Sequence, residues 1–131
     1  MGDIMSTLYA QTSGTLTTKS DHFTPIPGLK LTLPKGVDVI ALVTLNLPNP
    51  FAEGNDFPGA MLGISVNSTV SPVQASFTYG VSQPQSANRM PTTLIVGVPL
   101  TLNPQEVVAL WYGVRGSTVI VDSPATLSAI I

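Results

Sequence analysis

Short apolar stretches separated by turn-forming residues run through the whole chain. The clearest is residues 37–47, in which one face carries Val37, Val39, Ala41, Val43, Leu45 and Leu47. The other face carries Asp38, Thr44 and Asn46, and is interrupted by Ile40 and Leu42. Alternation with a period of two is typical of a β-strand. Because apolar side chains occur on both faces, we expect one face to pack on an opposing sheet and the other on a neighbouring subunit.

Other segments are also rich in β-branched or aromatic residues and are bounded by Gly, Pro, Asn or Asp. They are residues 29–33, 60–66, 73–79, 93–102, 107–114, 118–121 and 125–131. The one helical candidate is a single turn at 103–106, where Asn103 is suited to cap and Pro104 to the first helical position. The pattern predicts an all-β sandwich of two sheets and leaves immunoglobulin-like and jelly-roll topologies both open.

The composition is poor in charge. Charged residues make up 9% of the 131 residues and hydrophobic residues 44%, whereas about 25% of an average soluble domain is charged. No run reaches the roughly 18 apolar residues of a membrane span, so we expect a homo-oligomer to bury the surplus apolar surface. The formal net charge of −2 gives no basic surface for nucleic acid. The length suits one domain, residues 1–131, with about residues 1–7 as a flexible start.

The sequence offers little catalytic chemistry. Cysteine is absent, which removes disulfides, thiolate metal ligands and a thiol nucleophile. The acidic residues form no recognisable pair for glycoside hydrolysis, and His22 has no nearby metal-binding or nucleophilic partner. We therefore expect no enzyme, no cofactor and no metal ion. Residues 1–5 lack a basic stretch before an apolar core, so no signal peptide is visible, and we expect cytoplasmic synthesis followed by non-classical release.

The only two arginines, Arg89 and Arg115, each lie in a short polar cluster. The first cluster comprises residues 78–79 and 85–91, and the second comprises 115–117 and 122–123. Hydroxyl and amide groups beside a guanidinium suit a neutral polyol such as a sugar. From the residues alone, an Arg–Asp pair is more often a structural salt bridge. Tyr79 is equally suited to the core and to a ligand, whereas Trp111 is most simply core.

Several separated motifs resemble one known family in order and spacing. They are Pro-Asn-Pro-Phe-Ala-Glu-Gly-Asn-Asp-Phe-Pro-Gly at 48–59, Phe-Thr-Tyr at 77–79, Arg-Met-Pro at 89–91, Val-Arg-Gly-Ser at 114–117 and Asp-Ser at 122–123. From about residue 22 onward the chain resembles the TNF-like lectin domain at the N-terminus of a Burkholderia superlectin. The resemblance implies a TNF-like jelly roll, assembled as a compact homotrimer, that binds fucosylated and blood-group oligosaccharides of cell surfaces between adjacent protomers.

The resemblance also implies which residues contact the sugar. One protomer would contribute Thr78, Tyr79, Ser86 and Arg89, and its neighbour would contribute Arg115, Asp122 and Ser123. We expect Arg115 and Asp122 to act as an oriented pair. Three pocket positions depart from the family pattern, with Phe51 and Met61 in place of tyrosines and Ala87 in place of threonine.

The three departures remove three hydroxyls. Each lost hydrogen bond is worth about 0.5–1.5 kcal/mol, so the preferred sugar stays open although fucose remains the expectation. The alternative function is a structural or receptor-binding trimeric head of the TNF or C1q kind, without a sugar ligand.

Overall fold

The computed structural model describes residues 7–85 and 88–131, and these residues form strands without any helix. The strands are β1 (Thr7–Gln11), β2 (Leu16–Thr18), β3 (Thr24–Leu33), β4 (Ile40–Leu47), β5 (Phe51–Glu53), β6 (Gly59–Val66), β7 (Thr69–Val70), β8 (Ala75–Thr78), β9 (Thr92–Pro99), β10 (Gln105–Val114), β11 (Thr118–Val121) and β12 (Thr126–Ile130). The predicted all-β class is confirmed for these residues. Ser86, Ala87 and residues 1–6 of the expected flexible start lie outside the described part.

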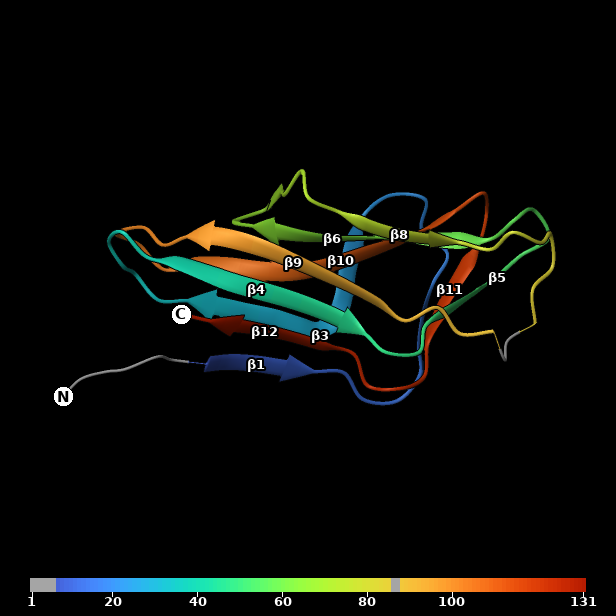
Figure 1. Ribbon diagram of the computed structural model, residues 1–131, viewed down its shortest axis with the longest axis horizontal. Helices are drawn as coiled ribbons and strands as arrows, with labels where there is room; N and C mark the ends of the chain where they lie inside the picture. Colours follow the sequence, from blue (N-terminus) through green and yellow to red (C-terminus); the bar gives the residue numbers. More distant parts are fainter. Residues whose placement is uncertain (1–6, 86–87) are drawn as a thin grey trace.

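The strands form three antiparallel sheets (Figure 1). The four-stranded sheet has the order β1-β12-β4-β9, and the five-stranded sheet has the order β3-β10-β6-β7, with β8 also paired to β6. The three-stranded sheet, β2-β11-β5, lies at the right-hand end in Figure 1. Neighbouring strands come from distant parts of the sequence, as β1 and β12 do. The architecture is consistent with a jelly-roll sandwich.

A single apolar core joins the sheets. The inward face predicted for residues 37–47 is buried where it lies within β4, at Ala41, Val43, Leu45 and Leu47. Val37 and Val39 precede the strand and are exposed. From the five-stranded sheet, Leu62, Ile64 and Trp111 enter the same core. Trp111 is 1% exposed, which confirms its predicted place in the core.

The structure departs from the predicted elements in two ways. The prediction of a helical turn at 103–106 is wrong, because Gln105 and Glu106 already pair with Leu33 and Thr32 of β3. In addition, β3 begins at Thr24 rather than at residue 29. The pairing of β10 with β3 shifts register between Val108 and Leu110. On the β3 side the chain passes through Gly28, whose positive φ of 86° is a conformation that glycine adopts at little cost.

The outer face of the four-stranded sheet is apolar. Ile40, Leu42, Ile95 and Ile130 are each more than half exposed there. They are close together, because Leu42 pairs with Ile130 across one strand boundary and Thr44 pairs with Ile95 across the other. Large aliphatic side chains gathered in this way differ from the scattered apolar residues of an ordinary surface. The described residues contain no helix that could span a membrane.

Candidate functional site

The candidate residues from both polar clusters are brought to one end of the sandwich. Residues 54–58, 80–85 and 88–91 and the turn between β10 and β11 all lie at the right-hand end in Figure 1. Backbone hydrogen bonds join these segments, from Met90 N to Pro50 O at 2.9 Å and from Tyr79 N to Pro58 O at 2.9 Å. The end of the molecule is therefore built from segments that the backbone itself holds together.

The Arg89 guanidinium is fixed from three sides. Its Nη1 donates to Asp122 Oδ1 at 2.9 Å and its Nη2 to Asp122 Oδ2 at 3.0 Å. Nη1 also donates to the Asn49 carbonyl at 3.1 Å, and the guanidinium carbon lies 4.1 Å from the centre of the Phe51 ring. Two parallel charge-assisted hydrogen bonds set both the position and the plane of the group. The pair stays open to a ligand, since its side chains are 30% and 34% exposed.

The predicted pairing of Arg115 with Asp122 is wrong, because Asp122 forms its salt bridge with Arg89 of the same chain. Arg115 instead donates from Nε to the carbonyls of Asp56 and Phe57, at 3.0 and 2.9 Å, and from Nη2 to that of Phe57. The physical reason is β11, whose four residues carry Asp122 roughly 13 Å along the strand from the turn that holds Arg115. Arg89 and Asp122 form a salt bridge within one chain.

Tyr79 connects the two clusters. Its hydroxyl donates to the Asn88 carbonyl beside Arg89, and its backbone N–H donates to the Pro58 carbonyl beside the Arg115 contacts. The ring is 6% exposed and packs edge to face on Phe77, with centroids 6.0 Å apart. The core alternative for Tyr79 is therefore confirmed. Its ring has little surface left for a sugar, but its hydroxyl positions the backbone next to Arg89.

Burial raises the pKa of the Tyr79 hydroxyl above its ordinary value, a change partly offset by the Ala52 backbone and the Arg89 charge. A raised folded-state pKa gives stability that is present below the unfolded-state value of about 10 and is lost as the pH rises through the folded-state pKa. We therefore expect the melting temperature of Tyr79→Phe to fall less than that of the parent above about pH 10. Thermal scans at increasing pH measure this difference.

The control for this prediction is Tyr9→Phe, because the Tyr9 side chain is 60% exposed. Its melting temperature should follow the parent curve over the same pH series. Near neutral pH, Tyr79→Phe should be less stable than the parent by about 1 kcal/mol through the lost hydrogen bond to Asn88. An identical alkaline fall in the parent and in Tyr79→Phe would contradict the assignment.

Ser117, in the second polar cluster, has a structural role. It is 1% exposed, and its Oγ accepts from Gly59 N at 3.0 Å and donates to the Val114 carbonyl. Its hydroxyl closes the turn between β10 and β11 and fastens that turn to the start of β6. It is not placed to contact a ligand.

The remaining candidates differ in how open they are. Thr78 is exposed at the end of β8, and Ser123 is half-buried beside Asp122. Met61 is half-buried in register with Ser76 and Tyr112 on the outer side of the five-stranded sheet. Phe51 is buried under the Arg89 guanidinium. Ser86 and Ala87 lie outside the described residues.

Sequence reasoning missed the carbonyl acceptors at this end of the molecule. The carbonyls of Asn49 and Asn88 hold Arg89 and Tyr79, and those of Asp56 and Phe57 hold Arg115. A backbone carbonyl has no signature of its own in the sequence, because every residue carries one. The one available signal was the Asn, Pro and Gly content of the loops, which indicates turns that leave carbonyls unpaired.

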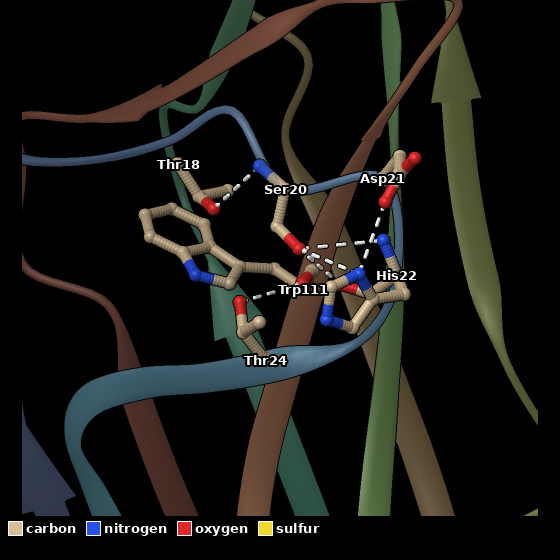
Figure 2. A network of polar contacts seen from close by, with 6 residues as sticks. All are labelled: Thr18, Ser20, Asp21, His22, Thr24 and Trp111. Carbon is tan, nitrogen blue, oxygen red and sulfur yellow. Dashed lines mark hydrogen bonds and ion pairs between the residues drawn. The ribbon is translucent and has the colours of Figure 1, made fainter.

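Another polar network lies between β2 and β3 (Figure 2). Ser20, Asp21 and His22 have the composition of a catalytic triad, but Ser20 Oγ and Asp21 Oδ1 both contact the same ring nitrogen, His22 Nδ1, at 3.3 and 3.0 Å. A relay needs the nucleophile and the acid on opposite ring nitrogens. The His22 side chain is also 78% exposed. In residues 7–85 and 88–131, no group of three or more His, Cys, Asp or Glu residues could hold a metal ion.

One protein family resembles this chain over most of its length. A family model described as "Bc2l-C, N-terminal domain" matches residues 7–130. Curated proteins give no match. The match spans nearly the whole chain, including Arg89, Arg115 and Asp122. It confirms the resemblance to the N-terminal domain of a Burkholderia superlectin.

Proposed function

We propose that this chain, which belongs to the Bc2l-C N-terminal domain family, is a lectin that binds fucosylated glycans. In this proposal the sugar lies between adjacent protomers of a homotrimer and needs no metal ion. The observation that carries the proposal is the pair of Arg89 and Asp122, held bidentate on the Phe51 ring and one third exposed. A fixed donor group and a fixed acceptor group on an open surface are suited to a ligand made of hydroxyls.

The hydrogen-bond inventory of the pair supports a neutral polyol. Arg89 has five N–H donors, and three of them are used by Asn49 and Asp122. Within residues 7–85 and 88–131, the Nε–H and one Nη2–H have no acceptor. Each Asp122 oxygen keeps lone pairs for a sugar hydroxyl. Because the two charges neutralise each other, the pair favours a ligand with dipoles over one with net charge.

Among residues 7–85 and 88–131, four surface hollows lie away from this end, lined by residues of β3, β4, β6, β7, β9 and β10 and their adjoining loops. Arg89 and Arg115 belong to separate contact networks within the protomer. A second copy of the chain would bring Arg115 of one protomer to Arg89 of its neighbour, which is the arrangement that we propose.

The apolar face of the four-stranded sheet supports self-association. Ile40, Leu42, Ile95 and Ile130 expose half or more of their surfaces in a chain with few charged residues. Burying such a patch against a symmetry copy is the usual way that homo-oligomers remove it from water. Three equivalent pockets on one trimer would also turn weak single-site binding into avidity on a glycan-coated surface.

A glycan array combined with light scattering tests the proposal. We expect binding to fucosylated structures, unchanged by a strong chelator, from a particle with the mass of three chains. Loss of binding on chelation would overturn the metal-independent site. An array without hits from an intact trimer would instead support the alternative of a structural or receptor-binding head. Cell-surface binding requires the protein to be outside the cell, and we propose non-classical release.

A further inference from the structure

A groove lies at the opposite end of the sandwich from the arginine clusters. It opens between the β6–β7 hairpin and the second half of β9 and has a volume of about 380 Å³. Its walls include Val66 and Val70 from the hairpin and Val96 and Val98 from β9, and its lining contains no charged residue. In Figure 1 the end of β9 that carries these residues is at the left. The volume falls in the range of small-molecule sites.

One polar side chain in the lining lacks a partner. Gln105, the first residue of β10, is 8% exposed and points inward with Val107 and Ala109. Its Oε1 is buried and has no hydrogen-bond partner among the described residues. Buried side-chain oxygens are nearly always paired, so an unpaired one calls for an explanation. The last torsion of a glutamine is broad, so the amide is able to rotate, and Gln105 lines the groove.

We propose that the groove binds a small neutral amphiphile, with a short apolar body between the valines and an N–H group that donates to Gln105 Oε1. The valine walls select an apolar body, because they offer it no polar contact. The uncharged lining disfavours an ionised head group, which would lose its hydration without gaining a counter-ion. A primary amide suits the site best, since it donates to the glutamine oxygen and accepts from the glutamine NH₂.

Titration of the isotope-labelled protein with hexanamide, followed by two-dimensional NMR, tests the proposal. We expect shifts in the backbone amides of Val66, Val70, Val96 and Gln105, saturating at an affinity in the millimolar range for so small a ligand. The matched probe is 2-heptanone, which has the same number of heavy atoms but no donor. We expect it to bind several-fold more weakly than hexanamide.

Two variants test separately what the Gln105 amide and the apolar walls contribute to ligand binding. Gln105→Leu should remove the preference for hexanamide over 2-heptanone, and Val70→Trp should block both probes by filling the mouth of the groove. Val81→Trp is the surface control, because Val81 is 53% exposed and does not line the groove; it should bind as the parent does. Equal shifts with both probes in the parent, or none up to about 20 mM, would overturn the proposal.

The oligomeric state in the presence of hexanamide distinguishes a small-molecule site from an interface between copies of the chain. If hexanamide dissociates the particle in light scattering, a second copy of the chain fills the groove and the small-molecule proposal is wrong. Glycan binding is measured in parallel, because the fucose proposal stands or falls with the array and is independent of this groove.

Discussion

Arg89→Ala is expected to abolish binding to fucosylated glycans, with at least a hundredfold loss of affinity. The substitution removes the guanidinium that presents donors to the sugar, and each lost hydrogen bond to a charged group is worth about 1.5–3 kcal/mol. It also leaves the Asp122 carboxylate without its two donors from Nη1 and Nη2. The carboxylate is then free to turn toward solvent. Binding is measured by calorimetry with a fucosylated oligosaccharide.

Arg89→Lys discriminates between charge and geometry. An ammonium keeps the charge but cannot form two parallel bonds to Asp122 or stack on Phe51 as a planar group. We therefore expect most of the affinity to be lost in this variant as well. The charge-matched control is Lys30→Ala, whose 64% exposed side chain pairs with Glu106 on another face, and it should bind as the parent does. Tight binding by an intact Arg89→Ala trimer would rule out the proposed site.

Arg115→Ala distinguishes an inter-protomer pocket from a pocket within one chain. Arg115 holds the Asp56 and Phe57 carbonyls and does not contact Asp122 in the described structure. If the sugar lies between protomers, Arg115→Ala should reduce affinity about tenfold or more, while light scattering still reports three chains. If binding is unchanged, the pocket is formed around Arg89 alone.

The strands were predictable wherever their side chains alternate over many residues. The inward face of β4 follows the pattern of Ala41, Val43 and Leu45 directly, because one side of that strand must face the core. The strands that were missed, β1, β2, β5 and β7, have two to five residues and lack a continuous apolar run like that of residues 119–121 in β11. Their pairing is set by long-range partners, as when β1 pairs with β12.

For the candidate site, the residue types were predictable but the partners were not. The presence of guanidinium, carboxylate and hydroxyl groups in two clusters was visible in the sequence. Which arginine meets Asp122 depends on residues 88–91 lying against the segment that carries Phe51, and on the direction in which β11 carries the chain. Neither follows from local spacing. The role of Tyr79 was likewise left open, because a tyrosine at the end of a strand suits the core and a ligand equally.

Gly113→Ala and Gly59→Ala are expected to be the most destabilising small substitutions in the described part of the chain. A Cβ at Gly113 would lie 2.3 Å from the Ser117 carbonyl oxygen, and one at Gly59 would lie 2.3 Å from the Phe77 carbonyl oxygen. Both obstacles are backbone atoms, so neither can be relieved by a change of rotamer. We expect a loss of about 3 kcal/mol or more, and a melting temperature lower by roughly 10 °C at a fixed protein concentration.

Gly80→Ala is the matched control, because a Cβ there meets no atom within 4 Å and the residue has no positive φ. Its melting temperature should equal that of the parent or exceed it slightly, since alanine restricts the unfolded chain. The clash at Gly113 involves the turn that carries Arg115, and the clash at Gly59 involves the strand end that carries Thr78. Loss of stability in these variants should therefore be accompanied by loss of glycan binding below the melting temperature. Unchanged melting in both variants would show that the two turns adjust freely, and the backbone of the site would then not be the rigid support inferred from its hydrogen bonds.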